Sequence, residues 1–201
     1  MSKIKKLYFQ LKKRYNLPEK QWKMWCRRPK TIKEREEVVI GAILTQNTNW
    51  QNVEKAIANL KKADLLNLDK IAKINLPKLK KLIKPCGFFN VKSKYLKDMA
   101  GFVLDSGGIK ELKKNNWLKL RENLLNQKGV GQETADSILN YALDKPSFVI
   151  DAYTRRFVKK YNLTQEQDYE KLKNLFQDSL KKDFRLYQDY HALIVIDGQN
   201  S

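Results

Sequence analysis

The segment that decides the fold reads LLNQKGVGQETADSIL and spans residues 124–139. Apolar residues at helical spacing predict a helix that ends near Gln127 and a second helix that begins at about Gln132. Between them, Gly129 and Gly131 enclose one apolar residue, Val130, which we expect to be buried. Glycine at both positions permits backbone angles closed to other residues and a close approach to a neighbouring segment. The segment therefore predicts two helices joined by a tight hairpin.

Such a hairpin offers a place for a phosphate group. Its turn leaves backbone N–H groups without partners, and the helix that begins at Gln132 and includes Thr134 adds further unpaired N–H groups. Lys128 places a positive charge beside them. Contacts of this kind bind DNA without reading its sequence. The alternative is an ordinary turn between two helices in which the glycines serve geometry alone.

The rest of the chain also predicts helices. In its 201 residues, with only 8 Gly and 5 Pro, apolar residues recur at helical spacing and no stretch alternates like a strand; Ser147–Ile150 comes nearest. We expect an all-α fold of about nine or ten helices. No apolar run reaches the roughly 18–20 residues of a membrane span, and the basic start has no apolar signal core. We therefore expect a cytoplasmic, nucleoid-associated protein with no membrane partner.

The net charge of +19, from 41 Lys and Arg against 22 Asp and Glu, favours a nucleic-acid partner. Cationic side chains neutralise phosphates and release counterions, which dominates non-specific affinity for DNA. The alternative is that many of the lysines are ordinary solvated residues on helix faces.

A candidate catalytic carboxylate follows in SFVIDAYTRRF, residues 147–157. Asp151 comes after an apolar run and opens an amphipathic helix. An aspartate at this place is a normal helix N-cap. The same carboxylate could stabilise a cationic sugar or activate water.

Taken together, these segments resemble the helix-hairpin-helix (HhH-GPD) DNA glycosylase superfamily. The hairpin and its Thr-Ala, followed by Val149-Ile150-Asp151, are similar to the family pattern, and VIGAILTQNT at 39–48 resembles the segment before the damaged-base pocket of endonuclease III relatives. FFNVKSK at 88–94 and YHAL at 190–193 extend the likeness to about residues 30 to 198.

The resemblance implies a two-lobed fold with the active-site cleft between the lobes. Residues 34–143 would form a six-helix barrel lobe that contains the hairpin, and 1–33 with 144–201 a second helical lobe. Asp151 falls on the catalytic aspartate of the family. The hairpin residues Lys128, Gly129, Val130, Gly131, Gln132 and Thr134 would bind DNA.

Two departures from the family narrow the activity. Bifunctional members carry a hairpin lysine that forms a Schiff base, whereas this chain has Glu133, and a carboxylate cannot form an imine. Many relatives bind an iron–sulfur cluster through four cysteines near the carboxyl end, but Cys26 and Cys86 are the only cysteines here. The resemblance thus implies either no cluster or a truncated form, no metal site and no cofactor, although the hairpin carbonyls could hold a monovalent cation.

Chains that lack the lysine and read Leu-Thr-Gln-Asn-Thr resemble the 3-methyladenine glycosylases of the endonuclease III family. Aromatic rings attract a flipped, positively charged alkylated purine. Trp50 falls on a pocket aromatic of that group, and Trp22 and Trp25 are looser matches that could equally be core residues. Glu133 would also face the pocket.

Gln46 and Asn47 are the candidates for filling the gap in the duplex. The lone histidine, His191, is expected to be a core polar contact, Cys26 and Cys86 to be packing thiols, and Asp136 to be a capping or surface residue.

We therefore expect a monomeric, monofunctional DNA N-glycosylase of base excision repair that acts on double-stranded DNA containing an alkylated purine. The alternatives are a glycosylase for an oxidised pyrimidine or a mismatched base, and a helix-hairpin-helix module that binds DNA without chemistry.

Overall fold

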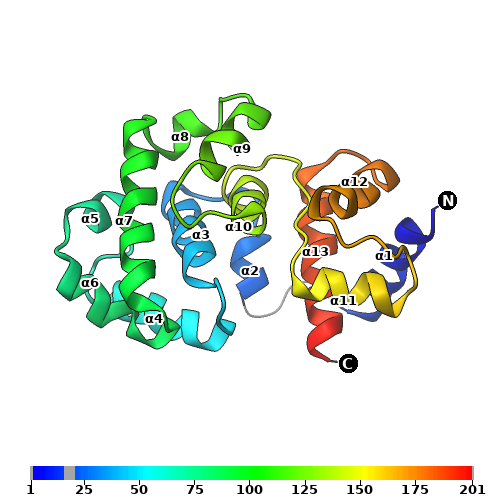
Figure 1. The fold of residues 1–201 in the computed structure, drawn as a ribbon, viewed down its shortest axis with the longest axis horizontal. Coiled ribbons are helices and arrows are strands. Elements are labelled where there is room, and N and C mark those ends of the chain that lie inside the picture. The colour runs from blue at the N-terminus through cyan, green and yellow to red at the C-terminus, as the bar shows by residue number, and fades with distance from the viewer. Residues whose placement is uncertain (1, 16–20, 201) are drawn as a thin grey trace. The chain divides into compact units, whose positions relative to one another are not determined.

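The chain is helical throughout the part that the structure describes. A computed structural model describes residues 2–15 and 21–200, and within these ranges it contains helices joined by turns and loops, without a strand (Figure 1). Ser147–Ile150 runs as an irregular segment. The expected all-α class is confirmed. None of the described helices is long and apolar enough to cross a membrane.

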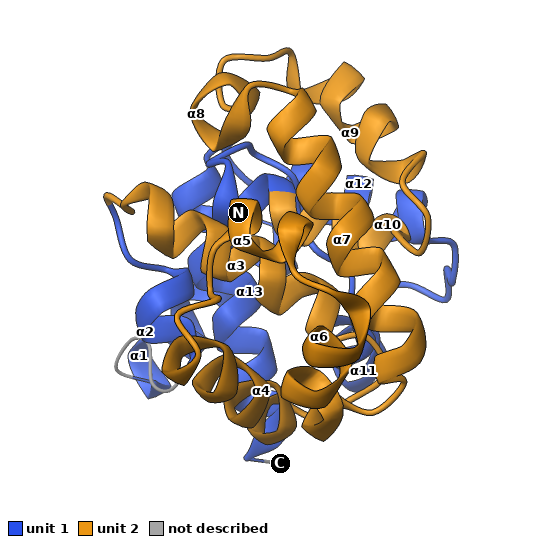
Figure 2. Ribbon diagram, turned by 90° about the vertical axis from the view of Figure 1, so that its left-hand side faces the viewer, with its two compact units in different colours: residues 1–28, 139–201 blue, residues 29–138 orange. Residues whose placement is uncertain are grey.

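Contacts divide the chain into two compact units, residues 1–28 with 139–201 (unit 1) and residues 29–138 (unit 2) (Figure 2). These differ from the lobes expected from the sequence in the assignment of residues 29–33 and 139–143. The six-helix barrel stays a prediction.

Unit 1 is organised around one long buried helix at its carboxyl end. Its helices are α1 (Lys3–Arg14), α2 (Gln21–Trp25), most of the π-helical turn η2 (Ile138–Ala142), α11 (Ala152–Lys160), α12 (Tyr169–Ser179) and α13 (Phe184–Gln199). Both α1 and α11 pack on α13. Its core is rich in aromatic rings: Phe148 stacks on Phe176 at 4.4 Å between ring centroids, and Tyr190 donates to the Ile4 carbonyl. This packing surrounds the middle of α13, where His191 lies.

Unit 2 contains the hairpin and surrounds a helix whose second half is apolar on all sides. Its helices are α3 (Ile32–Leu44), α4 (Trp50–Lys62), α5 (Leu68–Lys73), α6 (Leu76–Ile83), the 3₁₀ turn η1 (Lys84–Cys86), α7 (Phe89–Asp105), α8 (Gly108–Leu112), α9 (Trp117–Leu125) and α10 (Gln132–Ser137). Residues 38–44 of α3 are all buried, as expected for a central helix. The long helix α7 packs on α3, α5, α6 and α8.

Short polar side chains set where many helices begin. Thr31 and Glu34 form a reciprocal capping box at the start of α3, and Asn49, Asn67 and Asn75 accept N–H groups at the starts of α4, α5 and α6. The described residues contain thirteen α-helices, more than the nine or ten that the sequence predicts.

One expectation for unit 2 is wrong. Asp136, expected to be a capping or surface residue, is fully buried and receives two hydrogen bonds from Arg121, at 2.8 and 3.0 Å. This ion pair joins α9 to α10 on either side of the hairpin.

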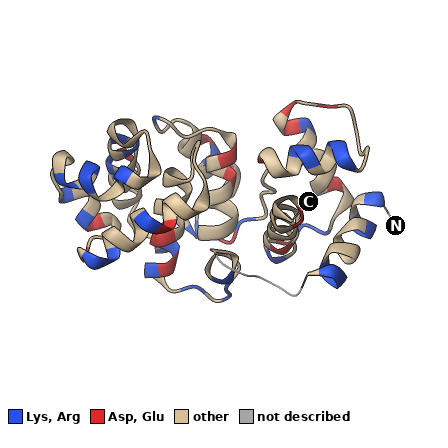
Figure 3. Cartoon of the chain, turned by 90° about the horizontal axis from the view of Figure 1, so that it is seen from below, with Lys and Arg blue, Asp and Glu red and all other residues tan. Residues whose placement is uncertain are grey.

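Lysine and arginine occur along helices of both units, with acidic residues interspersed (Figure 3). Two of the lysines serve the fold instead of the surface charge. Lys92 and Lys97 each donate to two main-chain carbonyls, those of Leu44 and Cys86 and those of Ala72 and Ile74 respectively. These two lysines count toward the net charge but are not available to contact a phosphate.

The buried pair between Arg121 and Asp136 predicts a large effect of one substitution. Asp136→Ala should lower the free energy of unfolding by about 3 kcal/mol, because it leaves a largely buried guanidinium without its carboxylate. The control, Glu111→Gln in the exposed pair with Lys114, should cost less than about 1 kcal/mol. Urea denaturation measures both; equal small losses would contradict the structural role of the pair.

Candidate active site and nucleic-acid interface

The hairpin has the expected form. Helix α9 ends at Leu125, α10 begins at Gln132, and Val130 between them is 7% exposed. The Val130 N–H donates to the Gln127 carbonyl at 3.1 Å, which closes the turn. A buried valine between two exposed glycines fixes the loop to the body of unit 2 and leaves its backbone at the surface.

The two glycines have different roles. Gly129 has a φ of +78°, and a Cβ there would lie 2.2–2.4 Å from ring atoms of Tyr95 on α7. Gly131 has an ordinary extended backbone, with φ −89°, and a Cβ there would meet nothing within 4 Å. Glycine permits unusual backbone angles at both positions, but Gly131 does not adopt them. Gly129 alone is required by conformation and by close approach.

Gln46 connects the hairpin to the end of α3. Its Nε2 donates to the Gly129 carbonyl at 2.9 Å and to the Thr134 hydroxyl at 3.1 Å. The side chain thus holds both sides of the turn. Asn47, next in the chain, is exposed and has a left-handed backbone with φ 51°. Their roles in filling a gap in a duplex stay predictions.

The hairpin presents polar groups that could meet a phosphate. The N–H groups of Gly129 and Gly131 donate to no atom of the described residues. Lys128 is exposed beside them, Gln132 is half-buried, and Thr134 is buried and receives the Gln46 amide. Two free amides with an adjacent cation are a suitable anion-binding arrangement.

Lys92 is a residue whose position the sequence analysis did not anticipate. It is 3% exposed, and its Nζ donates to the Leu44 carbonyl at 2.8 Å and to the Cys86 carbonyl at 2.9 Å. Burial lowers its pKa, partly offset by Cys86. It joins the end of α3, just before Gln46, to the turn that carries Phe88, which is 68% exposed with a φ of 45°. Nothing in the local sequence distinguishes it from a surface lysine.

In unit 1, Asp151 is the N-cap of α11. Its Oδ1 accepts the Thr154 N–H at 2.7 Å, and its Oδ2 lies 3.4 Å from Nε2 of His191 on α13. The side chain keeps 16% of its surface exposed, so a reactant can reach it. Burial opposes ionisation, but His191 and the Thr154 N–H outweigh it and hold the Asp151 pKa below its ordinary value. The carboxylate is therefore charged at neutral pH.

The two tryptophans of α2 lie behind this carboxylate. Trp22 and Trp25 are 4% and 5% exposed and meet edge to face at 5.9 Å between ring centroids. Both pack on Tyr141, and Trp22 also packs on His191. Their burial agrees with the alternative that both are core residues. Contact of either ring with a base stays a prediction.

Trp50 and Glu133 are both accessible in unit 2. Trp50 is the first residue of α4, is half-buried, and donates its indole N–H to Glu54 at 2.8 Å. Glu133 is exposed in the first turn of α10. A carboxylate at this position, unlike a lysine, cannot supply an amine nucleophile.

The cysteines do not suit a four-thiolate cluster. Cys26 and Cys86 are buried free thiols, and each donates to a main-chain carbonyl, of Gln188 and of Asn52. Burial raises the pKa of Cys86 to about 11. A protonated, buried thiol is a packing group, as expected.

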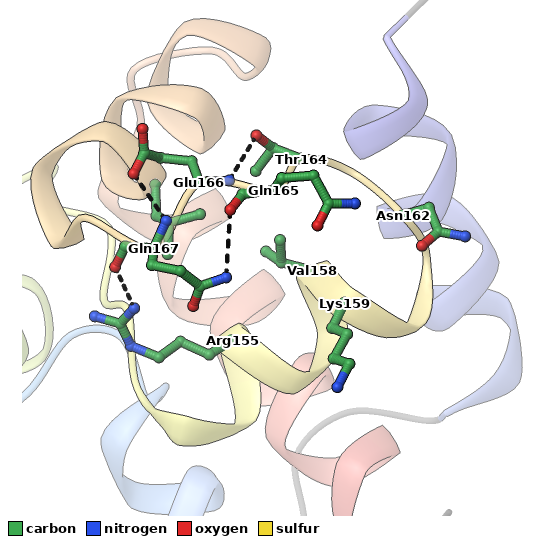
Figure 4. A pocket seen from close by; sticks show the side chains of 9 residues that line it. Arg155, Val158, Lys159, Asn162, Thr164, Gln165, Glu166 and Gln167 are labelled. Carbon is green, nitrogen blue, oxygen red and sulfur yellow. Dashed lines mark hydrogen bonds between the residues drawn. The ribbon is translucent and has the colours of Figure 1, made fainter.

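A concavity of about 350 Å³ in unit 1 contains none of the predicted site residues. It lies between α11 and the loop that precedes α12, where the Arg155 guanidinium donates to the Gln167 carbonyl at 2.6 Å (Figure 4). Some of its polar side chains bond to the loop itself: Glu166 accepts the N–H groups of Gln167 and Asp168, and the Gln167 amide donates to the Gln165 carbonyl.

The glycine hairpin and the ionised, accessible aspartate at a helix start agree with one class of protein. The chain belongs to the HhH-GPD superfamily of base excision DNA repair proteins. The sequence model of this family matches residues 40–182. The chain is thus a DNA glycosylase-family protein of base excision repair.

Individual relatives agree with this class. A protein of Methanocaldococcus jannaschii named as a candidate DNA repair glycosylase is 51% identical over 165 residues, 80% of this chain and 75% of that protein. The structure of a Helicobacter pylori 3-methyladenine DNA glycosylase bound to 1,N6-ethenoadenine is similar, with a TM-score of 0.77 and 34% identity over 98% of this chain and 95% of that chain. A trapped endonuclease III–DNA covalent intermediate shares the fold, with a TM-score of 0.75 and 14% identity over 100% and 88% of the two chains.

The two hairpin glycines predict opposite effects of the same substitution. Gly129→Ala should lower the free energy of unfolding by at least about 1 kcal/mol, because the new methyl group meets Tyr95 and the left-handed backbone disfavours alanine. Gly131→Ala should leave stability unchanged or raise it by up to about 0.5 kcal/mol, since its angles suit alanine. Thermal and urea unfolding of both variants provide the test, and a greater loss at Gly131 would show the hairpin geometry to be wrong.

Proposed function

We propose that this chain is a monofunctional DNA N-glycosylase that removes an alkylated purine of the 3-methyladenine kind from double-stranded DNA. The observation that carries the proposal is the Asp151 carboxylate, which is charged, 16% exposed and oriented by the Thr154 N–H. Its match to the catalytic aspartate of the family supports the assignment.

The chemistry follows from the charge of the substrate. An alkylated purine is already cationic, so it leaves without strong acid assistance, and positive charge develops on the deoxyribose. A fixed carboxylate in a partly desolvated place stabilises that charge more than water does. Asp151 would then orient a water molecule and accept its proton as the new C–O bond forms.

The hairpin supplies sequence-independent binding. DNA phosphates suit the N–H groups of Gly129 and Gly131 and the Lys128 ammonium. Contacts to phosphates position the duplex but carry no sequence information. A lesion enzyme needs this, because damage arises in any sequence. We propose a monomer acting on duplex DNA.

The absence of lyase activity rests on Glu133. The family position for the Schiff-base amine holds an exposed carboxylate in this chain, and Lys128 precedes the hairpin. Water is therefore the proposed nucleophile.

The substrate class is supported by the Helicobacter pylori relative, a 3-methyladenine glycosylase at 34% identity. Electron-rich rings attract a cationic base, and Trp22, Trp25 and Trp50 are the proposed aromatic residues. Contact of any of them with the base is part of the proposal.

The direct test is to measure which bases the protein releases from methylated duplex DNA, by mass spectrometry. The wild type should release 3-methyladenine-like purines, and Asp151→Asn should be at least about 100-fold slower with DNA affinity retained. Asparagine is also a good N-cap, so α11 should remain folded. Asp168→Asn, which changes the N-cap of α12 in the same way, is the matched control and should keep the wild-type rate.

The other outcomes separate the alternatives. Wild-type release by Asp151→Asn would overturn the catalytic assignment. Release of an oxidised pyrimidine or a mismatched base in place of a methylated purine would overturn the substrate class, and DNA binding without release of any base would favour a non-catalytic module. A borohydride-trapped protein–DNA adduct would overturn the monofunctional assignment.

A further inference from the structure

His191 lies in a position that a core contact alone does not require. It is the only histidine of the chain, it is 4% exposed in the middle of α13, and its Nε2 faces Asp151 Oδ2 at 3.4 Å. The following inference concerns unit 1 and rests on the proposed function, because it assigns a role to a residue behind the proposed catalytic carboxylate.

The other side of the imidazole is held by Tyr141. The Tyr141 hydroxyl oxygen is 2.7 Å from His191 Nδ1 and 3.2 Å from the Gln188 carbonyl oxygen, and both are buried contacts. A phenol has one proton, so it donates either to Nδ1 or to the carbonyl. Burial raises the Tyr141 pKa well above its ordinary value, which keeps that proton in place.

The direction of the Tyr141 hydrogen bond determines which nitrogen of a neutral His191 ring carries the proton. If Tyr141 donates to Nδ1, neutral His191 carries its proton on Nε2 and points it at the carboxylate. If Tyr141 donates to Gln188, Nδ1–H must donate to the Tyr141 oxygen, and only a doubly protonated ring still presents N–H to Asp151. An N–H therefore faces Oδ2 in the first arrangement, and in the second only when the ring is protonated on both nitrogens; a neutral ring in the second arrangement would place a lone pair opposite the carboxylate.

The ring cannot easily rotate out of this arrangement. Trp22 meets it edge to face at 82° and 5.6 Å, and Phe148 does so at 90° and 6.4 Å. Aromatic packing on two sides, together with the bond to Tyr141, fixes the direction of Nε2. Asp151 is in turn held at Oδ1 by Thr154. The row Tyr141–His191–Asp151 is thus fixed at both ends.

Nε2 makes no hydrogen bond to the described residues, and Asp151 Oδ2 lies opposite it at the distance of an ion pair. We propose that His191, oriented by Tyr141, is a positioning residue for the reaction: it presents an Nε2–H to Asp151 Oδ2 across this gap and keeps the carboxylate ionised until it accepts a proton from the attacking water. His191 does not touch the sugar in this proposal. It acts through Asp151.

The other titratable groups around the row leave this role to His191. The Cys26 thiol donates to the Gln188 carbonyl, and Asp189 is paired with Arg28 at 2.9 Å. Cys26 and Asp189 add to the burial that raises the pKa of the Tyr141 phenol, and neither contributes to the shift of the Asp151 pKa. His191 is the charged or titratable side chain that lowers the Asp151 pKa.

The first test needs no activity. Because the chain has one histidine, the ring nitrogen resonances in an NMR spectrum belong to His191 without ambiguity. These resonances show which ring nitrogen carries a proton. Nε2 should carry a proton in the wild type, and its resonance should move in Asp151→Asn, because the group opposite it changes from a carboxylate to an amide. An Nε2 without a proton in the wild type, or a resonance that is the same in the wild type and in Asp151→Asn, would overturn the proposal.

The second test measures base release against pH under single-turnover conditions. His191→Gln keeps an N–H donor near the Nε2 position without the charge, and His191→Phe removes both. The acid limb, which reports ionisation of Asp151, should move upward by about one pH unit in His191→Phe and less in His191→Gln. DNA affinity should not change in either variant.

Tyr141→Phe isolates the orienting step, and Tyr190→Phe is its matched control. Both remove a buried phenol hydroxyl, but Tyr190 donates to the Ile4 carbonyl, away from Asp151. Tyr141→Phe should slow base release about tenfold more than Tyr190→Phe at equal stability. Equal rates for these two variants, or an unchanged acid limb in His191→Phe, would overturn the role of the row.

The two tests also separate this inference from the proposed function. If the wild type released no base from any lesion, the proposed function would fail, while the NMR spectrum would still decide whether Nε2 of His191 presents a proton to Asp151. If base release required Asp151 but Nε2 carried no proton, only the role of His191 would fail.

Discussion

The bond from the Thr154 N–H to Asp151 Oδ1 is the constraint on which the functional account depends. A helix start offers unpaired N–H groups, and an aspartate placed there is held by one oxygen while its second oxygen stays available. Here that second oxygen faces His191, so the carboxylate is oriented from two sides. The capping role and the proposed catalytic role are therefore compatible in one residue, because the cap supplies the orientation that the proposed reaction requires.

In unit 2, three contacts hold the hairpin in place. Tyr95 packs on Gly129 so closely that no side chain fits there, Gln46 donates to Gly129 and Thr134, and Arg121 joins the two flanking helices through Asp136. Together they hold the loop in place, so that its N–H groups would already be aligned for the proposed phosphate contact. Such preorganisation reduces the ordering cost of binding.

Much of this could be predicted from the sequence, because local patterns set it. Helical spacing gave the all-α class, the apolar residue between glycines gave a buried Val130, and an aspartate after an apolar run gave the N-cap at Asp151. The buried roles of Lys92 and Asp136 could not be found this way. Each depends on a partner distant in the sequence, and their local surroundings are those of ordinary surface charges. The same holds for Gln46, whose partners lie 83 and 88 residues away.

The central claim is that Asp151 stabilises positive charge on the sugar. The most direct measurement compares the affinity for duplex DNA carrying a cationic pyrrolidine in place of the lesion nucleotide with that for a neutral tetrahydrofuran analogue. A site that is complementary to the charged transition state should bind the cationic analogue at least about tenfold more tightly, and Asp151→Asn should abolish this preference. An equal preference in the wild type and in Asp151→Asn would contradict the claim.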